Sequence, residues 1–310
     1  MSEYTHVEHP FLTQVATLGW EVVDQGHGHI PSDPAASLRE HFRECLLPGV
    51  FREAVRAINT TAAGEPWLTE RQLDDLRDQL LRQPGHGLLE ANEACHKLLF
   101  KAQVDRNEVT GEADPAVALI DFAHPERNRF HAVNQFRIDT PGCVKRCIIP
   151  DVVLFVNGLP LVVVEAKIGD ANTANPLHAA YEQLLRYRGG RAATRDAGLR
   201  EGEPRLFHTN LMVVRTCGEA CEYGSISSGH EHFFPWKWTP ADAALPEPHR
   251  SQEELIHGLL APTTLLEVLR TGTVFMDTDA GARIKVVARY QQYRAARRIV
   301  ERLRAGSTAD

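Results

Sequence analysis

The chain has 310 residues, enough for one large domain or two modest ones with an ample hydrophobic core. Its composition is ordinary for a globular protein, with 43% hydrophobic and 24% charged residues, and the net charge of −7 argues against wholesale wrapping of nucleic acid. No uncharged apolar run reaches the about 18 residues of a membrane span, and the acidic N-terminus lacks a signal-peptide core. We therefore expect a cytoplasmic protein with no membrane partner.

The first part of the chain predicts helices. Apolar residues of 7–20 fall on one helical face, with Pro10 tolerable in the first turn and Gly19 as the stop, and Glu8 lies near the helix start. Apolar spacing predicts a further series over 37–47, 51–58, 69–82 and 88–101. Thr69 to Gln72 has the form of a capping box. We assign no chemistry to residues 33–102.

Strands are predicted next, over 117–122 and 129–138. Asn134 and Gln135 fall in the second strand, and we expect them to be structural, or to position functional residues by contacting them, rather than to be catalytic. Residues 149–167 read IPDVVLFVNGLPLVVVEAK, two β-branched runs on either side of Asn157-Gly158. Asn-Gly accepts the positive φ of a tight turn, so this stretch predicts a β-hairpin.

The hairpin brings charged residues together. If Val156 and Pro160 close its loop, Asp151 lies directly opposite Glu165, where Cβ atoms are about 5 Å apart. Alternation places Lys167 on the same face. Two carboxylates this close repel unless a divalent cation neutralises them, and hard oxygen ligands suit Mg²⁺. Solvated charges at a strand edge are the simpler alternative, but the hairpin and its flanks favour a metal-dependent phosphodiesterase site.

These residues carry a resemblance to a known family. Pro150-Asp151, a gap of 13 residues and Glu165-Ala166-Lys167 resemble the PD-(D/E)xK nuclease motif. The surrounding PDVVLFVNGLPLVVVEAK resembles the nuclease segment of the type I restriction enzyme motor/endonuclease subunit. Ala166 departs from the bulky apolar residue usual there, but its expected role is that of its backbone carbonyl.

The resemblance implies roles for individual residues. Asp151, Glu165 and the Ala166 carbonyl hold Mg²⁺, while Lys167 positions the attacking water and stabilises charge on the phosphorus. Residues 7–22 resemble the opening of the same domain, so Glu8 is an expected auxiliary metal or water ligand, although a charge near a helix N-terminus is an equal alternative.

Residues 175–188 predict a helix with Pro176 in its first turn. Gln183 and Tyr187 match a QxxxY signature of the family, and Arg186 lies on the same face. We expect these three residues to contact DNA phosphate or to brace the metal ligands; packing of the helix face on the sheet is the alternative. Another strand is predicted over 205–216.

The composition changes from residue 247, with helices predicted over 253–260 and 263–270 and a longer basic helix over 283–304. ARYQQYRAARRIVERL resembles the segment ahead of the nucleotide-binding loop of the family's motor, so Arg289, Tyr290 and Gln292 are expected to recognise adenine in a full-length enzyme. No GxxxxGK[ST] motif occurs, so ATP is not expected to bind this chain alone.

Three other features leave alternatives open. Seven arginines lie in 186–215 and eight basic residues in 283–304, and each stretch either contacts phosphate or is a solvated face. The six cysteines are most simply reduced thiols, although some nucleases of this fold hold iron–sulfur clusters. The cysteine pairs that could form a metal or cluster site are Cys143-x-x-x-Cys147 and Cys217-x-x-x-Cys221.

The resemblance implies an α/β fold: a restriction-endonuclease-like core, a mixed β-sheet flanked by helices, with an N-terminal helical insertion and a C-terminal helical segment. We expect a nuclease domain over 1–246, with the insertion at 30–105, and a helical linker and truncated helicase-like motor over 247–310. The expected activity is Mg²⁺-dependent endonuclease cleavage of double-stranded DNA, without sequence specificity, after ATP-driven translocation. The expected partners are the methyltransferase and specificity subunits of a restriction–modification complex.

Two rivals stay open at this point. A stand-alone repair or recombination nuclease of the same superfamily would not need the C-terminal motor segment. A non-catalytic assembly module would not need an intact Asp151, Glu165 and Lys167.

Overall fold

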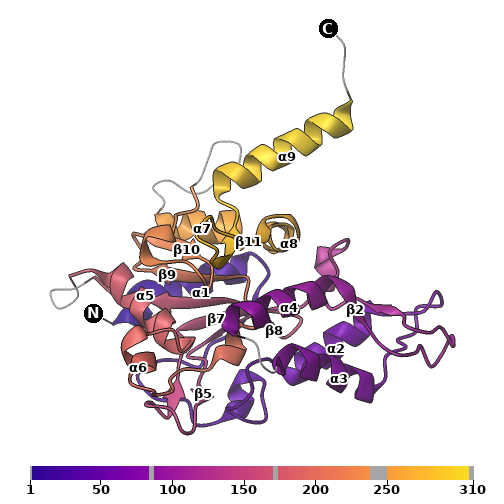
Figure 1. Ribbon diagram of the computed structural model, residues 1–310, viewed down its shortest axis with the longest axis horizontal. Coiled ribbons are helices and arrows are strands. Elements are labelled where there is room, and N and C mark those ends of the chain that lie inside the picture. The colour runs from indigo at the N-terminus through magenta and orange to yellow at the C-terminus, as the bar shows by residue number, and fades with distance from the viewer. Residues whose placement is uncertain (1, 84–86, 170–173, 238–249, 307–310) are drawn as a thin grey trace.

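The computed structural model describes residues 2–83, 87–169, 174–237 and 250–306. A six-stranded mixed sheet runs through its centre in the order β1-β4-β7-β8-β9-β10, with helices on both faces (Figure 1). β1 pairs parallel to β4 and β8 parallel to β9, and the other pairings are antiparallel. The strands are β1 (Glu21–Val23), β4 (Phe130–Asn134), β7 (Val152–Val156), β8 (Leu159–Ala166), β9 (Met212–Thr216) and β10 (Cys221–Gly224). The expected fold class, a mixed sheet flanked by helices, is confirmed.

The predicted hairpin is β7–β8, and its turn is tighter than expected. Asn157 and Gly158 have φ of 50° and 76°, which is the backbone of a two-residue turn. Val156 therefore pairs with Leu159, and the expected closing pair with Pro160 is wrong. A register shift after Leu154 then adds one residue to β8, so that Val152 faces Val164. The register expected at the catalytic end is thereby restored.

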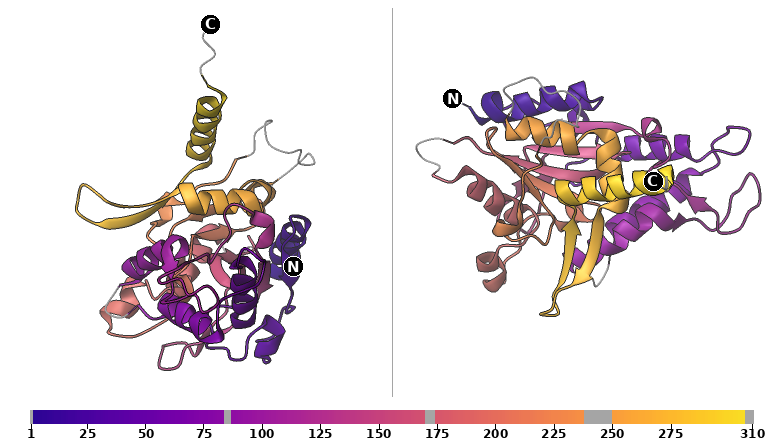
Figure 2. Two further views of the ribbon diagram at one scale, coloured as in Figure 1. Left: turned by 90° about the vertical axis from the view of Figure 1, so that its right-hand side faces the viewer. Right: turned by 90° about the horizontal axis from the view of Figure 1, so that it is seen from above.

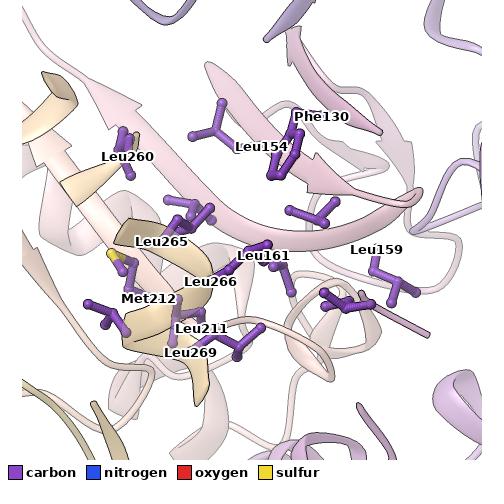
Figure 3. Packing of buried hydrophobic residues seen from close by; sticks show 14 of the residues in the cluster. Phe130, Leu154, Leu159, Leu161, Leu211, Met212, Leu260, Leu265, Leu266 and Leu269 are labelled. Atoms are coloured by element: carbon purple, nitrogen blue, oxygen red, sulfur yellow. The ribbon is translucent and has the colours of Figure 1, made fainter. Parts of the chain in front are cut away.

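Each face of the sheet carries its own hydrophobic core. Alternate residues of β7, β8 and β9 pack toward α8 on one face, and Figure 3 shows Leu154, Leu161 and Met212 beside the leucines of α8. The other set packs against α5 on the opposite face. The hairpin strands are buried throughout because both faces are covered.

The N-terminal helix packs along one edge of this assembly. A π-helical turn, η1 (Tyr4–Glu8), leads into α1 (His9–Thr17), and the chain turns at Gly19 with φ 91°. α1 packs against β1 and against α7 (Ser251–Leu259), which lies far along the sequence (Figure 2).

Three of the four predicted helices of the N-terminal half form. They are α2 (Pro48–Ile58), α3 (Glu70–Leu81), with the predicted Thr69 capping box, and α4 (Leu88–Lys101). The helix predicted over 37–47 is wrong: η2 (Pro34–Ser37) is a single 3₁₀ turn, and an irregular segment follows. Long-range bonds hold that segment instead, because the buried Arg39 donates to the Arg137 carbonyl and Leu47 N donates to Gly158 O.

The predicted outer strands are shorter than expected. Of the strand predicted over 117–122, only Val117 pairs; it belongs to β3 (Ala116–Val117), which pairs with β2 (Ala102–Gln103). The strand predicted over 129–138 breaks at Gln135, whose φ is 47°. This break divides it into β4 and β5 (Ile138–Asp139), and β5 pairs with β6 (Cys147–Ile148). The strand predicted over 205–216 begins only at Met212, because η4 (Pro204–Phe207) precedes it.

Helices and turns complete the core. α5 (Pro176–Tyr187) forms as predicted, with Asn175 capping it, and α6 (Ala192–Asp196) follows. The 3₁₀ turns η3 (Pro125–Arg127) and η5 (His230–His232) lie in connections.

The C-terminal segment differs from the predicted helices at one point. α7 and α8 (Pro262–Thr271) form as expected. The helix predicted over 283–304 is wrong at its start, because Arg283–Val287 is strand β12, paired with β11 (Thr273–Asp277). α9 (Tyr290–Ala305) begins after it and projects away from the body (Figure 1). Among the described residues, no helix has the length and apolar character needed to cross a membrane. The division into two domains stays a prediction.

Candidate active site

The open end of the β7–β8 hairpin brings Asp151 and Glu165 together, as the register predicts. Asp151 lies just before β7 and is 7% exposed, while Glu165 on β8 is 1% exposed. The Asp151 Oδ2 atom accepts a hydrogen bond from Ala166 N at 2.8 Å, which fixes this carboxylate across the hairpin. Both acids are therefore buried side by side at one edge of the sheet.

Lys167 supplies the positive charge between these acids. Its Nζ donates to Glu165 Oε1 at 2.6 Å and to the Ala166 carbonyl at 2.6 Å, and it lies 3.7 Å from Asp151 Oδ2. Its side chain is 23% exposed, so it is less buried than that of either acid. The structure thus brings together all three predicted catalytic residues.

The N-terminal helix adds two more carboxylates. Oxygens of Glu3, Glu8 and Asp151 lie within 4.8 Å of one another, the one group of three potential metal-binding side chains found among the described residues. Glu8 is 3% exposed, so it points into the site. Glu3 Oε1 also lies 3.4 Å from Lys167 Nζ. Glu8 was predicted here and Glu3 was not.

Gln135 orients Glu8. Its Nε2 donates to Glu8 Oε2 at 2.9 Å, while its backbone N donates to Asp151 O at 2.8 Å. The positive φ of Gln135 ends β4 and turns the side chain toward the site. Asn134 is structural, because its buried amide holds the loop at Asp24 and Gly26.

The shared burial of these carboxylates shifts their pKa values upward. Burial raises the pKa of Glu8 to about 8, helped by the charge of Asp151. Burial likewise raises the pKa of Asp151 to about 6 against the opposing effect of Lys167, and burial with Asp151 raises that of Glu165. For Lys167 burial acts downward, but the surrounding carboxylates outweigh it and raise its pKa, so the amine stays charged. The site has more negative charge than its own cation can offset.

Gln183, Arg186 and Tyr187 form a supporting chain behind the hairpin. Arg186 Nε donates to Gln183 Oε1 at 3.1 Å, and Gln183 Nε2 donates to the Tyr187 hydroxyl at 3.3 Å. The buried Tyr187 hydroxyl donates in turn to Ile149 O at 2.9 Å, two residues before Asp151. These hydrogen bonds brace the segment that leads through Asp151 into β7.

The residues predicted for nucleotide recognition lie at the start of α9, outside the six-stranded sheet that carries the candidate site. Arg289 N donates to Gln292 Oε1 at 2.8 Å, so Gln292 caps its own helix. The Arg289 guanidinium lies over the Phe234 ring at 3.5 Å from its centroid, and Tyr290 packs against the core. A role in binding ATP stays a prediction.

Sequence reasoning missed Glu3 because no pattern links it to a site 148 residues along the chain. The one signal in the sequence was the spacing of five residues between Glu3 and Glu8. Side chains five residues apart lie on the same face of a helix only if the helix winds more loosely than an α-helix. The π-helical turn at Tyr4–Glu8 provides that winding.

Comparison with known proteins agrees with this geometry. A family model described as the Type I restriction enzyme R protein N terminus matches residues 1–240. The chain is 29% identical over 290 residues to the Type I restriction enzyme HindI endonuclease subunit of Haemophilus influenzae, a match of 93% of this chain and 25% of that protein. It is 24% identical over 317 residues to the putative type I restriction enzyme MjaIXP endonuclease subunit of Methanocaldococcus jannaschii, covering 96% of this chain and 27% of that protein. The chain thus spans about a quarter of the length of these relatives.

Proposed function

Because this chain belongs to the family of type I restriction enzyme R protein N termini, we propose that it is the part of an endonuclease subunit that hydrolyses DNA phosphodiester bonds, with Mg²⁺ as cofactor. The single observation that carries the proposal is the buried convergence of Asp151, Glu165 and Lys167 at the end of one hairpin. The similarity to subunits named as endonucleases supports it.

The residues present fit a divalent metal ion. Glu165 Oε2 is fully buried and has no hydrogen-bond partner among the described residues, although a buried carboxylate oxygen is normally satisfied. Carboxylate and carbonyl oxygens are the ligands that Mg²⁺ prefers. A divalent cation would also stabilise the charged forms of Glu8, Asp151 and Glu165, whose pKa values are raised first by burial and further by neighbouring carboxylates.

We assign the ligand roles on this basis. Asp151, Glu165 and the Ala166 carbonyl would hold the ion, and Glu8 would serve as an auxiliary ligand directly or through water. Glu3, which shares the carboxylate group with Glu8 and Asp151, joins this set. When bound, Mg²⁺ supplies Lewis-acid stabilisation of the scissile phosphate and acidifies water.

Lys167 performs the remaining chemistry. The carboxylates around it keep it protonated, so it can donate to the phosphate and stabilise the negative charge that develops there. Its contact with Glu165 holds the ammonium group in place before DNA arrives, which limits reorganisation during the reaction. The products are 5′-phosphate and 3′-hydroxyl ends.

We extend the proposal to the complex that the resemblance implies. Cleavage of double-stranded DNA has no sequence preference of its own and follows ATP-driven translocation by the motor part of the full-length enzyme. The methyltransferase and specificity subunits then provide recognition of the site.

Nicking of supercoiled plasmid tests the proposal. We expect the chain to nick plasmid in Mg²⁺ but not in EDTA. Asp151→Asn, which removes a ligand of the ion, and Lys167→Met, which removes a transition-state donor, should each reduce the rate by about 100-fold or more. Lys101→Met, exposed at the end of α4, is the matched control and should nick normally. Metal binding by calorimetry provides a second measurement. Nicking by Asp151→Asn at the normal rate, or a chain that neither nicks nor binds Mg²⁺, would refute the proposal.

A further inference from the structure

A concave feature lies outside the candidate active site. It is a cleft of about 590 Å³ where the chain after β5, the end of α5, α6 and the segment leading into η4 come together. Thr140, Pro141 and Cys143 form one wall, while Gly189, Arg195 and the stretch 199–205 form the other. Cys143 Sγ lies 3.8 Å from Gly202 O, so the two walls touch at the base.

The negative charges of this cleft are already neutralised. Each carboxylate in its walls is bound by an arginine of the same region, at 2.5–2.8 Å between the closest atoms. The pairs are Asp139 with Arg137, Glu201 with Arg191, and Glu203 with Arg205. The walls therefore offer no net negative charge.

Positive charge remains in excess. Arg43, Arg195 and Arg200 line the cleft, are exposed, and have no salt-bridge partner among the described residues. Lys145 and Arg146, on the turn between β5 and β6, are likewise exposed. Although the chain has a net charge of −7, these side chains create a locally positive electrostatic potential that attracts anions.

Both walls lead directly to the candidate active site. β6 continues through Ile149, whose carbonyl binds Tyr187, to Asp151. The other wall begins where α5 ends, and Glu203 N donates to the Tyr187 carbonyl at 2.8 Å.

We propose that this cleft binds the phosphate backbone of duplex DNA beside the scissile phosphate, with Arg43, Arg195 and Arg200 as phosphate contacts. The proposal rests on the proposed nuclease function and specifies where its substrate lies. Arginine suits the role because its guanidinium group binds phosphate through two parallel hydrogen bonds and stays charged. Contacts of this kind position the duplex without reading its sequence, which fits cleavage without sequence preference.

The test is a triple variant, Arg43→Gln, Arg195→Gln and Arg200→Gln, compared with the unaltered chain for binding of a labelled duplex in EDTA, where no cleavage occurs. Each lost phosphate contact reduces the slope of log affinity against log salt by about 0.9, so the slope should fall by nearly 3. We expect affinity at low salt to fall at least about 10-fold. The three substituted residues are exposed, so folding should be preserved, and circular dichroism checks this.

The matched control removes the same total charge at the other end of the molecule. Arg71→Gln, Arg82→Gln and Arg106→Gln substitute exposed residues on and near α3 and should leave both slope and affinity unchanged. An unchanged salt slope in the cleft variant, or an equal loss in the control variant, would overturn the proposal. Asp151→Asn separates it from the nuclease assignment, because that variant should bind duplex normally while failing to nick plasmid.

Discussion

Lys285 on β12 is a buried amine with no carboxylate partner among the described residues, and it makes the docking of the C-terminal hairpin testable. The residue is 3% exposed, and its Nζ donates to Asn92 Oδ1 at 3.0 Å and to the Asn210 carbonyl. Burial lowers its pKa from 10.5 to about 7. Asn92 lies on α4 and Asn210 just before β9, so this amine joins the hairpin to two other parts of the fold.

The lowered pKa makes stability depend on pH with a definite sign. Between pH 7 and 10.5 the folded protein binds fewer protons at Lys285 than the unfolded chain does, so stability rises with pH across this window. Below about pH 7 burial of the charged Lys285 lowers the unfolding free energy by its full amount. This is about 5 kcal/mol, at 1.36 kcal/mol for each unit between the two pKa values. Linkage then predicts that the unfolding free energy rises by about 3 kcal/mol between about pH 6 and about pH 9.5.

Lys285→Met keeps a side chain of similar length and removes the titrating amine. We expect the unfolding free energy of the unaltered chain, measured relative to the variant, to rise by about 3 kcal/mol from about pH 6 to about pH 9.5. Urea unfolding followed by tryptophan fluorescence measures it, and Lys101→Met, exposed on α4, is the control that should show no such trend. A change below about 1 kcal/mol would refute the reasoning, because Lys285 would then not be buried and β12 would not dock on α4.

Three further predictions concern the hairpin and its site. Tyr187→Phe leaves the Ile149 carbonyl without its donor and should lower the unfolding free energy by about 1–3 kcal/mol and slow plasmid nicking; unchanged urea unfolding would contradict the bracing role. Gly158→Ala places a Cβ 2.6 Å from the Leu47 carbonyl at a φ of +76° and should cost about 1–3 kcal/mol or more, seen as a lower melting temperature; an equal melting temperature would exclude the close approach. Removing Mg²⁺ with EDTA should lower the melting temperature of the unaltered chain but hardly that of Asp151→Asn, since only an intact site gains stability from the ion; equal shifts would place the ion elsewhere.

Local sequence determined the hairpin and several helices. Asn157 and Gly158 accept positive φ with little strain, so the turn is fixed by two residues. The capping residues Thr69 and Asn175 mark helix starts that the structure reproduces. Alternation along β8 then sets Glu165 and Lys167 on one face, which needs no knowledge of the rest of the fold.

Tertiary contacts decided what periodicity left open. Residues 38–47 carry a helical apolar pattern, yet the buried Arg39 donates to the Glu44 carbonyl and to the distant Arg137 carbonyl, and the segment stays irregular. Arg283–Val287 also fits a helix in sequence, but pairing with Thr273–Asp277 makes it a strand. In both cases distant partners outweigh a weak local preference.

The candidate site divides in the same way. The sequence by itself determined that Asp151, Glu165 and Lys167 lie on one hairpin and that Glu165 and Lys167 share a face, because the turn and the alternation are local properties. The register that sets Asp151 opposite Glu165 depends on the shift after Leu154, which the expected Val156–Pro160 pairing did not contain. Only the tertiary structure decided that Glu3 and Glu8 complete the carboxylate group, that Gln135 orients Glu8, and that the cleft's carboxylates are neutralised. These depend on how helices and loops far apart in the chain pack against the sheet, and no local pattern specifies that packing.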